Sequence, residues 1–164
     1  HISINLDYTD ILNPQIKKTL LRKIKDNKIG SYLTLEILES EKVSNFELVN
    51  KFINETKQYG VKIAIDDFGT GFSNYENILN LDINYIKIDG SLIRKIDETI
   101  YLNLIKSIVS FSKEQNIKVV AEFVSDLKIL RYVKSVGIDY SQGYQIGKPM
   151  HINDIIKGNK WTIS

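Results

Sequence analysis

An α/β fold with a parallel sheet is the fold class that this sequence predicts, and three observations support it. Six short apolar segments alternate with segments of helical spacing, as expected for consecutive βα units. A polar side chain stands at or near the carboxyl end of each of the six segments, which is the edge where βα barrels place their active sites. The 164 residues are 43% hydrophobic and 26% charged, which is enough material for one core.

Composition excludes several classes of function. The 22 basic and 20 acidic residues leave a net charge of +2, which is too small to indicate a nucleic-acid or membrane-surface partner. The absence of cysteine excludes disulfides and thiolate metal sites, and it fits a reducing compartment. No apolar run approaches the roughly 20 residues of a membrane-spanning helix, and no signal peptide is visible. We therefore expect a cytoplasmic domain, although the parent protein could still be anchored to a membrane.

The first βα unit begins at the amino end. Residues 2–5 alternate between apolar and polar side chains, as a strand does, and end in an amide. Asn13 followed by Pro14 is typical of a helix start, and the helix is expected to end near Gly30.

The second unit carries two glutamates. Residues 33–38 predict a strand with Glu36 near its end, and Glu39 follows three residues later. The spacing of Ser44 and Glu47 is that of a capping box and predicts the start of the next helix.

Residues 63–73 read Ile-Ala-Ile-Asp-Asp-Phe-Gly-Thr-Gly-Phe-Ser, and the rest of the chain is organised around them. An apolar strand ends in Asp66 and Asp67, whose side chains should point in different directions because side chains alternate along a strand. Gly69 and Gly71 allow the backbone to approach a ligand closely. Taken alone, the segment is equally typical of an ordinary strand-to-helix turn.

Three further strands are expected at residues 85–89, 118–122 and, more weakly, 140–144. Helices are expected around residues 76–79, from a cap at Asp97, after Asp126, and near the carboxyl end. The polar residues at or near the six strand ends are Asn5, Glu36, Asp66, Lys87, Glu122 and Gln142.

These side chains suit one kind of metal. Carboxylate and amide oxygens without histidine or cysteine favour Mg²⁺ or Mn²⁺ over zinc or copper. Two such ions bridged by Asp66 could activate water and stabilise the attacking and leaving oxygens of a phosphodiester. Lys87 would be a compact cation among them, orienting the nucleophile or neutralising charge. Alternatively, Lys87 is only ion-paired to the acids.

The motifs along the chain are Asn5, Glu36-x-x-Glu39, Asp66-Asp67-Phe68-Gly69-Thr70-Gly71-Phe72-Ser73, Lys87-Ile88-Asp89, Ala121-Glu122-Phe123-Val124 and Gln142-Gly143-Tyr144. In this order they resemble the motifs of the EAL-domain cyclic-di-GMP phosphodiesterases, and the resemblance covers nearly the whole chain. It implies an incomplete TIM (β/α)8 barrel of about six βα units and a reaction that converts cyclic di-GMP to linear pGpG in bacterial second-messenger signalling.

The resemblance also implies roles for individual residues. The metal ligands would be Asn5, Glu36 and Asp66 for one ion, and Asp66, Asp67 and Glu122 for the other. Lys87 and Gln142 would lie beside the attacking water, with Glu122 also catalytic. Glu39 would steady the loop at residues 67–73, which contributes to dimer contacts in this family. Asp89, Gly69 and Phe68 are expected on the substrate side.

Two departures from the family pattern bear on activity. Phe123, Val124 and Ser125 stand where the family usually has Gly-Val-Glu, so a glutamate contact should be lost and Phe123 should crowd the loop. The Glu-Ala-Leu segment and the first two strands are expected upstream of His1, which makes residues 1–164 the C-terminal part of a single EAL domain. We expect this part alone to be inactive and to need the missing strands or a second copy, because six strands leave two bare edges.

Three other functions compete with a phosphodiesterase. The domain could bind cyclic di-GMP without cutting it, although every metal-ligand position that can be checked holds a suitable residue. A different metal-dependent barrel, such as an enolase-like lyase, also places acids and lysines at strand ends. The domain could also serve only as a dimerisation platform.

Overall fold

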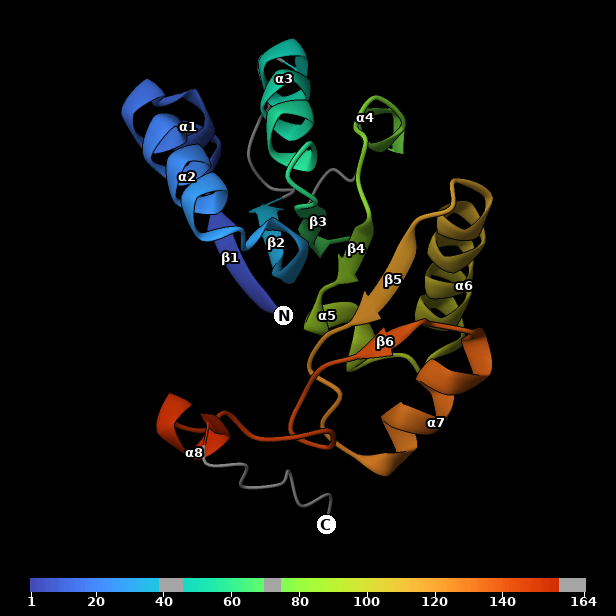
Figure 1. The fold of residues 1–164 in the computed structure, drawn as a ribbon. Coiled ribbons are helices and arrows are strands. Elements are labelled where there is room, and N and C mark those ends of the chain that lie inside the picture. The colour runs from blue at the N-terminus through green and yellow to red at the C-terminus, as the bar shows by residue number, and fades with distance from the viewer. Residues whose placement is uncertain (39–45, 70–74, 157–164) are drawn as a thin grey trace.

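The computed structural model describes residues 1–38, 46–69 and 75–156. Six parallel strands form one sheet in which the spatial order follows the chain order (Figure 1). The strands are β1 (Ile2–Leu6), β2 (Leu33–Leu38), β3 (Lys62–Phe68), β4 (Tyr85–Ile88), β5 (Lys118–Ala121) and β6 (Tyr140–Ser141).

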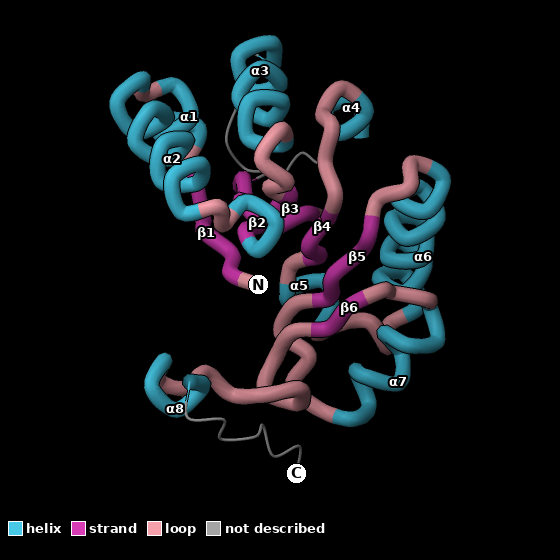
Figure 2. Tube along the Cα trace, viewed as in Figure 1, coloured by secondary structure: helices cyan, strands magenta, loops and turns pink. Residues whose placement is uncertain are grey.

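The long helices connect the strands and lie on the outer side of the curved sheet (Figure 2). Each long helix follows one strand and precedes the next, which is the right arrangement for parallel strands that need crossover connections. The helices are α1 (Tyr8–Leu12), α2 (Pro14–Asn27), the 3-10 turn η1 (Gly30–Tyr32), α3 (Phe46–Lys57), α4 (Tyr75–Leu79), α5 (Gly90–Ile93), α6 (Thr99–Glu114), α7 (Leu127–Val136) and α8 (Ile152–Ile156).

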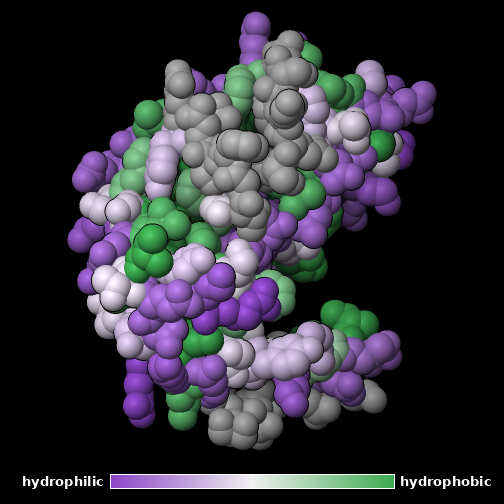
Figure 3. Space-filling view, turned by 180° about the vertical axis from the view of Figure 1, so that it is seen from behind, coloured by the Kyte–Doolittle hydropathy of each residue, from purple (hydrophilic) through white to green (hydrophobic). Residues whose placement is uncertain are grey.

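The sheet curves as a barrel does but does not close. Among the described residues, β6 pairs with β5 and not with β1, so β1 and β6 are both edges. Ile2 is 67% and Ile4 41% exposed on β1. The molecular surface is deeply indented between the lobe that carries α8 and the rest of the molecule (Figure 3). The predicted fold class, an α/β fold with an incomplete barrel, is therefore confirmed.

The core lies between the sheet and the outer helices. Phe52 and Ile53 of α3 and Ile105 and Ile108 of α6 are almost fully buried against the strands. Fully burying an isoleucine or phenylalanine side chain stabilises a fold by about 1.5–3 kcal/mol, so this layer holds the strands in register and fixes the positions of their ends.

Local signals explain several helix starts but not that of α6. Asn13 caps α2, accepting hydrogen bonds from the backbone N–H groups of Gln15 and Ile16. The prediction that Asp97 caps α6 is wrong: Glu98 is the N-cap residue, and the Asp97 carboxylate pairs with Lys128 on α7 instead. The predicted capping box at Ser44 lies outside the described residues.

None of the described helices has both the length and the apolar character that crossing a bilayer requires.

Candidate functional site

Three strand ends converge on the side chain of Lys87. Its ammonium nitrogen lies 2.7 Å from Oε2 of Glu36, 2.7 Å from Oδ1 of Asp66 and 2.8 Å from Oε1 of Glu122. All four side chains are buried, with exposed fractions between 8% and 11%. Four of the residues predicted at the six strand ends therefore meet at one place, inside the carboxyl-terminal mouth of the sheet.

A bulge in β3 brings two acids to this mouth. In the ladder with β4, Ile65 pairs with Ile86 and Phe68 with Ile88, so Asp66 and Asp67 lie opposite the single residue Lys87. Asp67 takes the extra position with φ +55°, a left-handed conformation that aspartate adopts more readily than most residues. Bulges of this kind re-aim side chains beside active sites.

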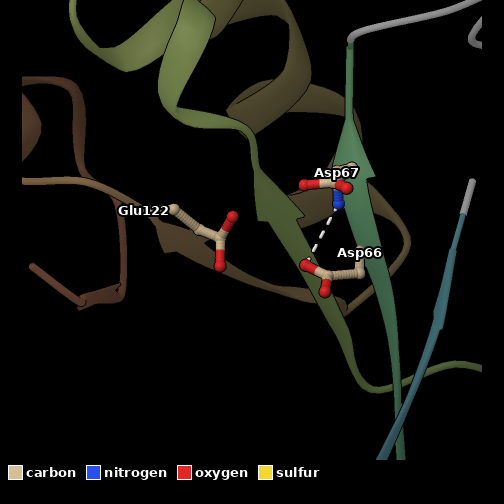
Figure 4. A group of neighbouring side chains, drawn as sticks. All are labelled: Asp66, Asp67 and Glu122. Carbon is tan, nitrogen blue, oxygen red and sulfur yellow. Dashed lines mark hydrogen bonds between the residues drawn. The ribbon is translucent and has the colours of Figure 1, made fainter. Parts of the chain in front are cut away.

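The bulge changes where the two aspartates point. In a regular strand, adjacent side chains would lie on opposite faces of the sheet. Here Asp66, Asp67 and Glu122 each offer a carboxylate oxygen within 4.8 Å of the others (Figure 4). The Asp67 backbone N–H also donates to Oδ1 of Asp66 at 3.1 Å, which holds the pair together.

The charges of the cluster perturb one another. Burial raises the pKa of Glu122, and the charges of Asp66 and Asp67 add to this, while Lys87 opposes it. Burial, followed by the charges of Asp66 and Asp89, also raises the pKa of Asp67. Burial alone would lower the pKa of Lys87, but hydrogen bonds to Asp66, Glu122 and Glu36 outweigh it and raise the pKa above its usual value. Lys87 is therefore a firmly charged ammonium ion.

The cluster has the donors and the charge that a divalent cation requires. Three carboxylates, from Glu36, Asp66 and Glu122, contact one ammonium group, and the Asp67 carboxylate lies beside them, so acidic groups outnumber basic ones in the cluster. Buried carboxylates in excess are costly unless a cation neutralises them. Hard oxygen donors without nitrogen or sulfur favour Mg²⁺ or Mn²⁺. The residues present therefore fit such an ion.

Asn5 and Gln142 flank the cluster on the two outer strands. Asn5 is directly opposite Glu36 in the β1–β2 ladder, and Gln142 follows β6. Both residues are exposed. Gln142 lines, together with Glu36 and Lys87, a cavity of about 330 Å³ inside the open barrel. The cluster is thus accessible from the barrel interior.

The three residues expected on the substrate side occupy different environments in the structure. Asp89 caps α5: its Oδ1 accepts a hydrogen bond from the Ser91 N–H at 2.7 Å. Gly69 has φ +99°, a conformation that favours glycine, and a Cβ at this position would also require the end of the Leu92 side chain to move. The side chain of Phe68 lies in the core, 1% exposed, because β3 continues through it. Glu39 lies outside the described residues.

Phe123, the first residue of the segment that departs from the family pattern, has φ +51°. That left-handed conformation is costly for a bulky residue and is free for glycine, which explains physically why glycine would suit this position. The ring packs on Gly90 at the start of α5, and the guanidinium carbon of Arg94 lies 4.9 Å from the ring centroid. Sequence reasoning missed Arg94, because neither a motif nor a strand end marks it.

Comparisons with known proteins agree with this geometry. The family model described as EAL domain matches residues 1–149. The cyclic di-GMP phosphodiesterase PdeA of Borreliella burgdorferi is 42% identical over 118 residues, which are 71% of this chain and 18% of that protein. The probable cyclic di-GMP phosphodiesterase PdeA of Escherichia coli is 36% identical over 154 residues, which are 93% of this chain and 21% of that protein. The chain thus spans about a fifth of the length of these relatives.

A solved structure shares the fold. The manganese and cyclic-di-GMP complex of Klebsiella pneumoniae BlrP1 has a TM-score of 0.78 to this chain and is 28% identical, covering 87% of this chain and 37% of BlrP1.

Proposed function

The chain belongs to the EAL domain family, and from this premise we propose that it forms part of a phosphodiesterase that hydrolyses cyclic di-GMP to linear pGpG. The single observation that carries the proposal is the position of Lys87 among Glu36, Asp66 and Glu122 at the barrel mouth, with Asp67 beside them. The named activities of the relatives supply the substrate. The reaction would take place in the cytoplasm as part of second-messenger signalling.

Two Mg²⁺ or Mn²⁺ ions would be held by the oxygen donors of the mouth. Asn5, Glu36 and Asp66 would hold the first, and Asp66, Asp67 and Glu122 the second. When bound, such ions lower the pKa of water and stabilise the charge on the oxygens of a phosphodiester. The β3 bulge supports this division, because it turns both aspartates toward Glu122.

The remaining side chains would position the reacting water and the substrate and neutralise negative charge. Lys87, a firmly charged ammonium ion, would orient the attacking water and neutralise charge as the phosphodiester reacts. Gln142, at the exposed edge of the interior cavity, would hydrogen-bond to the same water or to the substrate. Asp89 would act indirectly, because its carboxylate is engaged in capping α5 and so fixes the start of that helix next to the mouth.

Residues 1–164 alone are proposed to be inactive. Asn5 lies on β1, an edge strand whose Ile2 and Ile4 are exposed, so none of the described strands supports the first metal site from that side. Further strands, or a second copy in a homodimer, would cover the edge. Residues 1–164 that elute as a monomer in size exclusion, melt cooperatively and hydrolyse cyclic di-GMP would contradict this.

The test is an assay of cyclic di-GMP turnover by the protein that carries this domain. We expect pGpG to form in Mn²⁺ or Mg²⁺ and not after chelation. Asp66→Asn should abolish turnover, whereas Asp139→Asn, an acid-to-amide change away from the mouth, should not. Binding of cyclic di-GMP without turnover would instead identify a receptor, and failure to bind it would overturn the proposal.

A further inference from the structure

An aromatic column, which consists of Phe68, Tyr75 and Phe111, joins the end of β3 to the outer helix layer. The ring centroids of Phe68 and Tyr75 lie 5.7 Å apart and those of Tyr75 and Phe111 lie 4.7 Å apart, both in edge-to-face geometry. Such pairs are more favourable than their buried area alone accounts for, and the preferred geometry restricts where each ring can lie. The column therefore links α6, through Tyr75 at the start of α4, to the residue that directly follows Asp67.

The side chain of Phe68 faces the helix layer and not the barrel interior. Phe68 pairs with Ile88 in the β3–β4 ladder, and paired residues lie on the same face of a sheet. Ile88 follows Lys87, whose side chain points to the mouth, so Ile88 and Phe68 point outward. Their exposed fractions are 0% and 1%. Phe68 is therefore buried on the side where Tyr75 and Phe111 meet it.

This outward packing of Phe68 explains the bulge in β3. Ile65 is the preceding outward-facing residue of the strand, and Phe68 comes three positions later. Side chains on one face of a regular strand are two positions apart, so β3 can bury both only by taking up one extra residue, Asp67. A return to regular alternation would turn the Asp67 carboxylate away from Glu122, because a shift of one residue reverses the face of every side chain.

The backbone around the bulge depends on the same packing. The carbonyl of Phe68 accepts a hydrogen bond from the Asp89 N–H at 3.3 Å, and the Asp67 N–H donates to Oδ1 of Asp66 at 3.1 Å. Asp67 has φ +55°, a conformation that persists only where the surroundings enforce it. With its ring fixed in the column, Phe68 supplies such an anchor one residue away.

We propose that Tyr75 and Phe111 are positioning residues, which act through the ring of Phe68 to hold the β3 bulge and so keep the Asp67 carboxylate beside Asp66 and Glu122. The inference rests on the proposed function where it concerns metal binding, because Asp67 is one of the proposed ligands of the second ion. Groups that orient metal ligands from outside typically change metal affinity by 10- to 100-fold when they are substituted.

The experiment compares Phe111→Leu and Tyr75→Leu, which each remove one ring of the column, with Tyr75→Phe, which keeps the ring. Mn²⁺ binding to the full-length protein is followed by electron paramagnetic resonance. One of the two ions should bind about tenfold more weakly in both leucine variants and with wild-type affinity in Tyr75→Phe. The other ion, whose proposed ligands do not include Asp67, should keep its affinity in all three.

A second measurement needs neither metal nor cyclic di-GMP. In the metal-free protein, amide hydrogen exchange followed by mass spectrometry should be faster in Phe111→Leu for peptides that contain Asp67 and Phe68, because the bulge opens more often. The matched control is Phe52→Leu on α3, which removes a ring that is 1% exposed in the same helix layer and outside the column. It should leave Mn²⁺ affinity and exchange at the bulge unchanged, although it removes a deeply buried ring.

Equal effects in Phe111→Leu and Phe52→Leu would overturn the positioning role and leave the proposed function intact. Faster exchange with unchanged Mn²⁺ affinity would also overturn it, because the column would then support the strand and not the ligand. Absence of Mn²⁺ binding by the wild-type protein would overturn the metal site of the proposed function, and the exchange comparison would still decide whether the column holds the bulge.

Discussion

Two sets of lysine–carboxylate contacts in this molecule look alike in distance and differ in surroundings. At the barrel mouth, Lys87 lies 2.7–2.8 Å from three carboxylates, and its side chain is 8% exposed. On the outer surface, Lys128 lies 2.6 Å from Asp97, and its side chain is 68% exposed. Judged by distance alone, the contacts would contribute equally to stability. Any difference in their contributions must therefore come from the solvent around them.

Exposure to solvent determines how much each contact contributes to the stability of the fold. Water screens the surface pair and offers both partners alternative hydration, so such pairs contribute little to stability. At the mouth, the charged groups have left most of their hydration, and each depends on the others for compensation. The mouth is therefore a region where the fold tolerates a cost in stability, as the proposed chemistry would require, and the outer surface is one where charged residues can be substituted freely.

The largest expected effect is that of Lys87→Met. Removing the ammonium leaves Glu36, Asp66 and Glu122 buried together without a cation, which should lower the free energy of unfolding by about 3–5 kcal/mol. Chemical denaturation in the presence of a chelator measures it. Saturating Mn²⁺ should restore part of the loss, because the ion replaces the missing positive charge. Lys118→Met is the matched control, and equal losses in the two variants would contradict the comparison.

Asp66→Asn should separate metal binding from stability. We expect Mn²⁺ affinity to fall by roughly 100-fold, since substitutions of supporting groups alone cost 10- to 100-fold at metal sites. The metal-free protein should lose less stability than Lys87→Met, because Lys87 keeps Glu36 and Glu122 as partners. Titration of Mn²⁺ followed by paramagnetic resonance tests this, with Asp139→Asn as the control.

The sequence was sufficient to predict the mouth but not its internal geometry. Residues 33–38 were expected as a strand and form β2 with those bounds, because apolar alternation is a local property. The convergence of Glu36, Asp66, Lys87 and Glu122 followed from parallel strands sharing one edge. That two acids stand opposite one lysine could not be predicted, because a bulge depends on the register between strands rather than on either strand alone.

Two other features also needed the tertiary structure. Asp97 is a suitable helix cap by type, but the proximity of Lys128 on α7 offers its carboxylate a different partner. The conformation of Phe123 follows from hydrogen bonds to β4 and to the segment after β6, which are distant in sequence.

A smaller effect is expected at Asp139, which is intermediate between the two regions. Its carboxylate accepts hydrogen bonds from Lys118 at 2.7 Å and from the Val119 N–H at 2.9 Å. Burial alone would raise the pKa of Asp139, but these two hydrogen bonds outweigh burial and lower it. The contribution to stability is therefore complete above the unfolded pKa of about 3.9 and is lost as the pH falls through the lower folded value.

Asp139→Asn should therefore destabilise the protein by about 1 kcal/mol at pH 7. The difference from wild type should shrink as the pH falls below about 4. Urea denaturation at several pH values measures both. A difference that grows toward low pH would show that the carboxylate is not the stabilising form.

The smallest expected effect is that of Lys128→Ala on the outer surface. Lys128 and Asp97 join α7 to the turn before α6, and the ion pair lowers the pKa of Asp97 and raises that of Lys128. Because both partners are open to solvent, the midpoint of thermal unfolding should barely change, and raising the salt concentration to 1 M should remove any difference that remains. The same salt should leave the loss caused by Lys87→Met largely intact, since buried charges are screened far less. If salt instead removed both effects alike, Lys87 would have to be as hydrated as Lys128, and the contrast between the mouth and the outer surface would fail.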